Sequence, residues 1–128
     1  MECVSGDASS IILLAKATLL KTTCQNTELK MTETAYHEAT RKKEREDATL
    51  IIDLQEKDEI KIEKDPKNTG RIAEQFNMGG GESSTVALAG RENCIALTDD
   101  KRSLKAARAN NIDRATAASV IVSLSNAK

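Results

Sequence analysis

The sequence is short of aromatic side chains: it has one tyrosine, one phenylalanine and no tryptophan in 128 residues. Proteins that bind single-stranded nucleic acid without sequence preference stack bases on several aromatic rings, and Tyr36 and Phe76 are too few for such a platform. The core must therefore be built from isoleucine, leucine, valine and alanine. A chain of this length can bury such a core and is expected to form one domain over residues 1–128.

The chain also lacks an excess of charge of either sign, because 19 basic and 20 acidic residues leave a formal net charge of −1. The overall field of such a protein does not attract nucleic acid, so any contact with it must come from a local patch. The densest block of charge, residues 41–47 (RKKERED), carries both signs. We interpret it as a solvated helix surface or a corner between two helices.

Cysteine and histidine are scarce as well. Cys3, Cys24 and Cys94 are odd in number and lack the spacing of a metal site, so we expect reduced thiols in the core. The single histidine, His37, adjoins Glu38 on an expected helix. Neighbours on a helix point about 100° apart, so the two side chains cannot both face one site well.

Long apolar runs are missing. The run Ile11–Leu14 is followed by Lys16 and is far too short to cross a bilayer. No basic region precedes it, because Glu2 and Asp7 lie among the first residues, so a signal peptide is not expected. The sequence predicts a soluble, cytoplasmic protein without membrane attachment.

Short apolar strands alternate with helical patterns along the chain. Strands are predicted at residues 2–6, 27–31, 60–63 and 94–97, with a minimal strand at Ile112. One apolar stretch of helical character runs from Ser9 or Ser10 to Leu20, and the last helix is predicted to begin after Thr116. This alternation predicts an α/β fold in which helices cover both faces of a mainly parallel central sheet.

Four acidic residues lie where a predicted strand ends or a predicted helix begins or runs: Asp7, Glu38, Glu82 and Asp100. Ligands gather at the carboxyl ends of parallel strands, so acids far apart in the sequence can meet there. Carboxylates forced together repel one another and cannot all stay ionised without a cation. Oxygen ligands of this kind suit Mg²⁺ or Mn²⁺, which makes a metal-dependent nuclease the leading hypothesis.

Two of these acids have an equally ordinary explanation. Asp7 and Asp100 each precede a predicted helix, where aspartate is favoured as the N-cap residue. As metal ligands they would need orienting partners, and Ser9 is suited to Asp7, while Thr98 and Asp99 are suited to the loop at Asp100. Both interpretations stay open at this point.

The run Gly79-Gly80-Gly81 before Glu82 is not a P-loop, because it lacks the Lys-Ser/Thr pair and follows a helix rather than a strand. We interpret it as a glycine hinge that lets Glu82 and the start of its helix approach the site. An ordinary flexible turn is the alternative.

In their order and spacing, these residues resemble the PIN domain, and specifically the short prokaryotic PIN proteins related to VapC toxins. The resemblance covers most of the chain and includes a spacing of 18 residues between Glu82 and Asp100. The segments that carry it are Asp7-Ala8-Ser9, Tyr36-His37-Glu38, Gly80-Gly81-Glu82 and Ile95-Ala96-Leu97-Thr98-Asp99-Asp100-Lys101.

The resemblance implies a Rossmann-like α/β/α sandwich whose acids hold Mg²⁺ or Mn²⁺ to cleave RNA. It assigns Asp7, Glu38, Glu82 and Asp100 as the catalytic and metal-binding acids. Members of the family often form homodimers, and the toxin members are blocked by a small antitoxin protein. These properties are expectations for the present chain.

Cations near the expected site could contact the RNA backbone, and we select Lys16, Lys101 and Arg102. Lys105 and Arg108 follow on the same predicted helix as Lys101 and Arg102 and are further candidates. Solvated helix faces explain these residues equally well. The competing function is a PIN-like binding module whose acids do not assemble a working site. Receiver domains and haloacid-dehalogenase-like enzymes fit poorly, because both need an acidic pair or Asp-x-Asp after the first strand.

Overall fold

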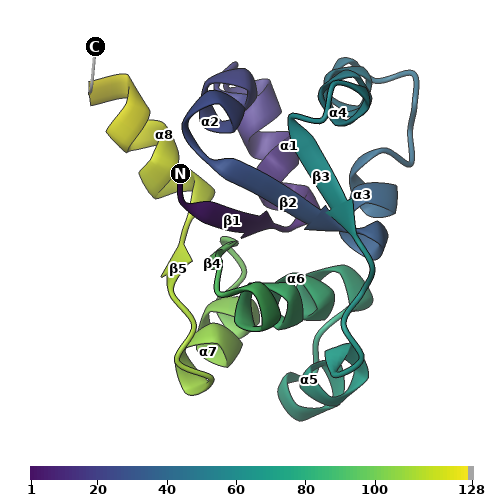
Figure 1. The fold of residues 1–128 in the computed structure, drawn as a ribbon, viewed down its shortest axis with the longest axis vertical. Coiled ribbons are helices and arrows are strands. Elements are labelled where there is room, and N and C mark those ends of the chain that lie inside the picture. Colours follow the sequence, from purple (N-terminus) through teal and green to yellow (C-terminus); the bar gives the residue numbers. More distant parts are fainter. Residues whose placement is uncertain (127–128) are drawn as a thin grey trace.

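The computed structural model describes residues 1–126 of the chain. One all-parallel sheet lies at its centre, with the strand order β3-β2-β1-β4-β5 (Figure 1). The strands are β1 (Cys3–Gly6), β2 (Glu28–Thr32), β3 (Ile60–Glu63), β4 (Ile95–Leu97) and β5 (Arg114–Ala115). Every neighbouring pair is parallel, which confirms the predicted sheet.

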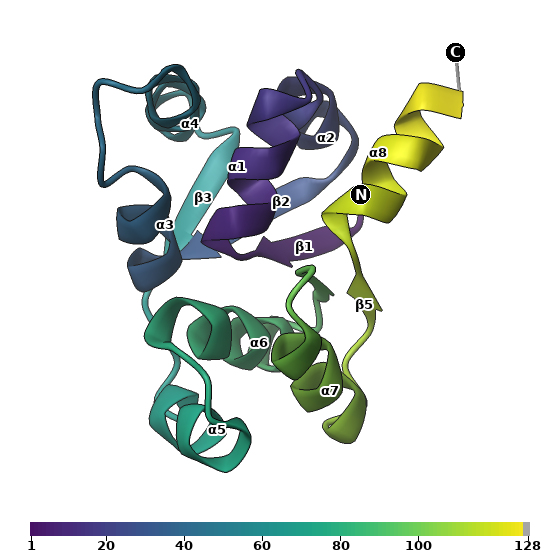
Figure 2. The same cartoon turned by 180° about the vertical axis from the view of Figure 1, so that it is seen from behind.

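Helices cover both faces of this sheet, as Figure 2 shows from behind. One layer contains α1 (Ala8–Lys16), α2 (Leu20–Asn26), α3 (Glu33–Ala39), α4 (Glu46–Glu56) and α8 (Ala117–Asn126). The other contains α5 (Thr69–Phe76), α6 (Gly80–Glu92) and α7 (Lys101–Ala109). The predicted α/β/α sandwich is therefore confirmed.

Alternation along the strands explains the two layers, because successive side chains of a strand point to opposite faces. On β4, Leu97 packs into the larger apolar cluster and Ala96 into the smaller one beside α6 and α7. On β1, Val4 joins the larger cluster, while the hydroxyl of Ser5 donates to the carbonyl of Thr85 in α6 at 2.9 Å. The core is aliphatic, as the shortage of aromatic residues requires.

Three local predictions differ from the structure in their details. The apolar stretch after Asp7 is two helices, because Thr18 takes a φ of 60° and ends α1. Ile112 is not a strand, because its N–H donates to the carbonyl of Ala107 at 2.8 Å and so completes the end of α7. Helix α6 begins at Gly80, so two of the three glycines lie in its first turn instead of forming a hinge before Glu82.

Residues 41–45 form the corner between α3 and α4, which is one of the two interpretations given to the charged block. Within residues 1–126, no helix is long and apolar enough to cross a membrane.

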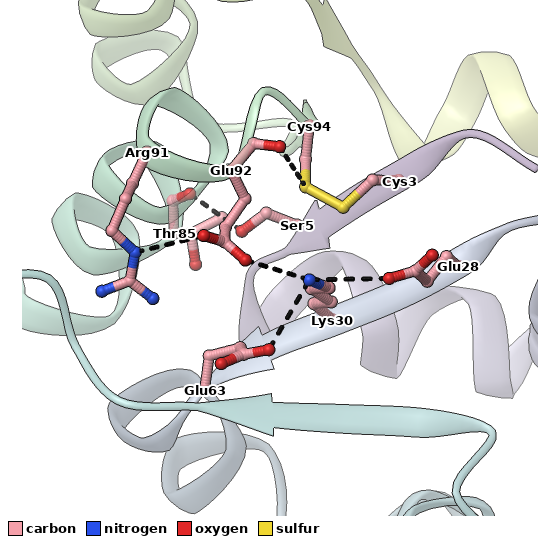
Figure 3. The surroundings of a disulfide bond; sticks show 9 residues. All are labelled: Cys3, Ser5, Glu28, Lys30, Glu63, Thr85, Arg91, Glu92 and Cys94. Carbon is pink, nitrogen blue, oxygen red and sulfur yellow. Dashed lines mark hydrogen bonds and ion pairs between the residues drawn. A yellow bond between two sulfur atoms is a disulfide. The ribbon is translucent and has the colours of Figure 1, made fainter.

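The expectation of reduced cysteines is wrong for two of the three, because Cys3 and Cys94 are joined by a disulfide (Figure 3). The register that pairs Val4 with Ile95 sets the two cysteines opposite each other, with their Cα atoms 4.6 Å apart. Sequence spacing could not reveal this pair, because strand register brings together residues separated by 91 positions. Cys24 is a free buried thiol, and burial, with a contribution from Glu59, raises its pKa to about 12.

Candidate active site

Four elements bring the acids of the sequence analysis to the carboxyl-end edge of the sheet. Asp7 follows β1 directly and Asp100 is the third residue after β4, while Glu38 lies on α3 and Glu82 on α6. The strands β1 and β4 are neighbours, so their ends deliver the two aspartates to one place.

Asp7 is the most buried of the four acids, with 3% of its surface exposed. It is the N-cap of α1, where one carboxylate oxygen accepts a hydrogen bond from the backbone N–H of Ser10 at 2.8 Å. The other oxygen accepts one from the hydroxyl of Thr98 at 2.5 Å. Both oxygens are therefore fixed in position by the protein.

Asp100 is the N-cap of α7 and accepts hydrogen bonds from the backbone N–H of Ser103 at 2.9 Å and from its hydroxyl at 3.1 Å. Its own backbone N–H donates to the hydroxyl oxygen of Thr98 at 3.2 Å. Thr98 thus contacts both aspartates and sets their relative position. The capping role considered for Asp7 and Asp100 is real, and it coexists with their convergence.

Glu82, in the first turn of α6, is the acid whose titration changes most clearly. Burial raises its pKa, and the carboxylate of Asp100 raises it further by its charge and by a shared hydrogen bond. The charges of Asp7 and Glu38 add to the same effect. Each of the other three acids is therefore close enough to Glu82 to disfavour its ionised form.

Gly81 allows Glu38 to reach this group. A Cβ atom on Gly81 would lie 1.8 Å from one carboxylate oxygen of Glu38, closer than any two such atoms can approach. Gly81 therefore leaves room for the present position of the Glu38 carboxylate, although this flexible and exposed side chain could also turn away from a larger residue.

A cleft of about 360 Å³ is lined by three of the four acids, Asp7, Glu38 and Glu82, and by Ser9, while Asp100 is not among its lining residues. A larger cavity of about 690 Å³ lies between α5, α6 and the loop before β5, but its only acidic lining residue is Asp113. The smaller cleft is therefore the better candidate for the active site, because several acids line it.

Of the supporting residues named from the sequence, two lie at the site and one points away from it. Ser9 lines the cleft and Thr98 binds Asp7, as described. The carboxylate of Asp99 points elsewhere, because it accepts the backbone N–H of Ala117 at 2.6 Å and caps α8.

The three cations named from the sequence lie apart from the cleft lining. Lys16 is at the far end of α1, about 13 Å along the helix axis from Asp7. The guanidinium of Arg102 donates to the carbonyl of Asn77 at 2.9 Å, which ties α7 to the end of α5. Lys101 is exposed in the first turn of α7, and neither it nor Arg102 lines the cleft.

Three other cations line the cleft and were missed by the sequence analysis. Arg41, Lys42 and Arg45 belong to the charged corner between α3 and α4 and share the cleft with Asp7 and Glu82. The available signal was their position just after the helix that carries Glu38, within seven residues of that acid.

Residues 3–128 match the family model DUF3368, which describes a PIN domain. The chain belongs to the PIN domain family. Among solved structures, the PIN domain is similar to the crystal structure of PAE2754 from Pyrobaculum aerophilum, with a TM-score of 0.64 and 18% sequence identity. That similarity covers 98% of each chain and supports the fold. No curated protein matches the chain in sequence.

PIN domains are generally nucleases that use divalent metal ions. In residues 1–126, no three aspartate, glutamate, histidine or cysteine side chains are already arranged around one metal position. The acids of the cleft nevertheless fit such an ion in their chemistry, because carboxylate oxygens are the donors that hard divalent cations prefer. The pKa of Glu82 is raised first by burial and then by repulsion from the other three acids, and a cation would relieve that repulsion.

Proposed function

We propose that residues 1–128 act as one PIN domain that cleaves RNA internally with the help of a divalent metal ion. The observation that carries this proposal is the meeting of acids from four elements at the carboxyl-end edge of the sheet: Asp7, Glu38 and Glu82 line one cleft, and Thr98 joins Asp7 to Asp100. The raised pKa of Glu82, caused by burial and then by the other three carboxylates, agrees with this arrangement. A protein gains no stability from such repulsion, so a gathering of acids in an open cleft suggests a site kept for a cation.

In this proposal Asp7, Glu38, Glu82 and Asp100 hold Mg²⁺ or Mn²⁺. When bound, the ion lowers the pKa of a water ligand and offsets the charge that builds on the phosphate. Thr98, Ser10 and Ser103 hold the two aspartates in place through the hydrogen bonds described above, so little reorganisation is needed when substrate arrives.

The biological setting we propose is that of a VapC-like toxin: a cytoplasmic homodimer whose cleavage of RNA is blocked by a small antitoxin protein. The resemblance of the sequence motifs supports this setting, whereas the disulfide between Cys3 and Cys94 is unusual for a cytoplasmic protein.

A PIN-like binding module without catalysis is the second candidate. The hydrogen bonds of the two aspartates favour it, because Asp7 and Asp100 each already use a carboxylate oxygen to cap a helix. The absence of a preformed metal group among the described residues points the same way.

The test is cleavage of a single-stranded RNA with Mn²⁺, with Mg²⁺ and with EDTA. We expect metal-dependent cutting, and we expect Asp7→Asn to lower the rate by on the order of a hundredfold or more. Asparagine also serves as an N-cap, so this substitution should leave the fold intact, while it removes the charge and the oxygen that accepts from the Thr98 hydroxyl.

Asp113→Asn is the matched control, because Asp113 is exposed and lies outside the cleft. Equal activity of Asp7→Asn and the control would remove Asp7 from the mechanism. Folded wild-type protein that cuts no RNA with either metal, yet gains thermal stability from Mn²⁺, would favour the binding module.

A further inference from the structure

The corner between α3 and α4 places its cations against the acidic cleft. Arg41, Lys42 and Arg45 are exposed and line the same space of about 360 Å³ as Asp7 and Glu82. Asp7 is buried there, and Glu38, Glu82 and Asp47 also line the cleft. A phosphodiester bound over Asp7 and Glu82 would therefore have these three cations beside it in the same cleft.

The cations are available to bind a ligand. No ion pair within 4 Å involves Arg41, Lys42, Lys43 or Arg45 in the described part of the chain. Lys101 and Arg102, by contrast, do not line this cleft or the second cleft described below. The guanidinium of Arg102 already donates to the carbonyl of Asn77.

The backbone of the corner is fixed, although its side chains are exposed. Buried Thr40 ends α3, and its hydroxyl donates to the carbonyl of Tyr36 at 2.8 Å. At the other side, the hydroxyl of Thr49 donates to the carbonyls of Lys43 at 3.3 Å and Arg45 at 3.0 Å. The cations therefore project from a defined position, which limits the entropy lost when they bind.

A second cleft adjoins the first. It measures about 430 Å³, is lined by His37 and Lys43 among others, and shares Glu38 and Arg41 with the first cleft. His37 is exposed there, and its ring meets that of Tyr36 edge to face with centroids 6.1 Å apart. The open face of an imidazole ring, like an arginine plane, can stack on an unpaired base.

We infer that the α3–α4 corner, residues 41–45, is the RNA-binding rim of the site. Phosphates next to the bond to be cut contact Arg41, Lys42 and Arg45, and the neighbouring nucleotide occupies the second cleft beside His37 and Lys43. This inference rests on the proposed function for the identity of the ligand, but its test does not depend on cleavage.

The test measures binding of a fluorescent single-stranded RNA by anisotropy at several salt concentrations, in an Asp7→Asn background that prevents cutting. The triple substitution Arg41→Gln, Lys42→Gln and Arg45→Gln should weaken binding by roughly tenfold or more at low salt. The slope of log K against log salt should fall by about 2, because each phosphate contact on a single strand contributes about 0.7.

The matched control is Lys21→Gln, Lys61→Gln and Lys67→Gln, which removes the same charge from exposed positions outside both clefts. The control should keep the slope of the parent protein. Equal losses in the two triple variants, or an unchanged slope in the first, would overturn the inference.

Two further variants locate the RNA-binding residues more closely. His37→Ala should weaken binding several-fold without changing the salt slope, because stacking involves no phosphate. The double substitution Lys101→Gln and Arg102→Gln should do less than the rim triple, and a larger effect would contradict the inference.

Failure of the proposed function can be told apart from failure of this inference. If the wild-type protein cuts RNA and the rim triple variant binds RNA as well as its control does, the nuclease proposal stands and the inference about the rim is refuted. Wild-type protein that binds RNA through the rim but never cuts it would refute the nuclease and support the rim. A parent protein that binds no RNA at low salt would refute the rim outright.

Discussion

Two groups of carboxylates in this molecule differ in what balances their charge. On the face of the sheet beside α6, the ammonium of Lys30 lies 3.5 Å from Glu28, 3.6 Å from Glu63 and 3.1 Å from Glu92 (Figure 3). At the carboxyl-end edge, Asp7, Glu38 and Asp100 surround Glu82, and each of them disfavours its charge. The first group is paired with Lys30, whereas within residues 1–126 no cation lies within 4 Å of the acids of the second group.

The pKa values record this difference. Burial alone would lower the pKa of Lys30, whose side chain is 12% exposed, but Glu92 and its neighbours raise it above its ordinary value. The hydrogen bond from Lys30 holds the pKa of Glu92 below the usual range. The pKa of Glu82 is raised instead. The carboxylates of the two groups thus shift in opposite directions, which agrees with the metal-binding role proposed for the second group.

The largest effect on stability should come from the disulfide that joins β1 to the segment before β4 beside the Lys30 group. Replacing Cys3 and Cys94 with serine should lower the free energy of unfolding by about 2–4 kcal/mol, because the loop between them is long. Urea unfolding checks this. A reductant should lower the free energy of unfolding of the wild type to that of the variant and leave the variant unchanged. If the reductant changes neither protein, the disulfide contributes nothing to stability.

A smaller loss is expected when the balanced group loses its cation. Lys30→Met keeps the aliphatic stem but leaves Glu28 and Glu63 without a partner and Glu92 with Arg91 alone, which should lower the free energy of unfolding by about 1–2 kcal/mol at neutral pH. The loss should shrink in acid, because the stabilising contribution of Glu92 exists above its ordinary pKa and disappears as pH falls through the lowered one. Lys61→Met, on the neighbouring strand but exposed, is the control and should have little effect.

The opposite sign is expected in the acid centre. Because the pKa of Glu82 is raised in the folded protein, its favourable contribution exists below the ordinary pKa and is lost as pH rises through the folded value. Without divalent metal, Glu82→Gln should therefore raise the melting temperature by a few degrees at neutral pH and by less in acid. Glu74→Gln, an exposed position on α5, should change nothing.

Added Mn²⁺ sharpens the same comparison. It should raise the melting temperature of the wild type more than that of Glu82→Gln, because the variant has lost one of the charges that the ion would balance. Equal gains in both proteins would remove Glu82 from the metal site.

Much of this arrangement could be predicted from the sequence because it depends on local signals. Strand patterns of period two and caps such as Thr32 and Thr116 fix where elements begin, and parallel topology then brings the ends of β1 and β4 together. Asp7 and Asp100 were found in this way.

The residues that sequence reasoning misjudged depend on three-dimensional neighbours. Asp99 and Asp100 are adjacent and chemically alike, yet one caps α8 and the other caps α7 at the cleft. Arg41 and Arg45 lie in an exposed corner, as one interpretation of the charged block predicted, but nothing local shows that this corner borders the cleft with the acids. The use of Gly81 becomes visible only with Glu38 against it.

The central position of β1 has a consequence for synthesis on the ribosome. Strands β2 and β3 emerge soon after β1 and can pair on one side of it, but β4, its partner on the other side, follows much later in the chain. An unpaired strand edge readily recruits other chains. Through most of translation the growing polypeptide therefore carries an open sheet edge, and only the last quarter of the chain closes it.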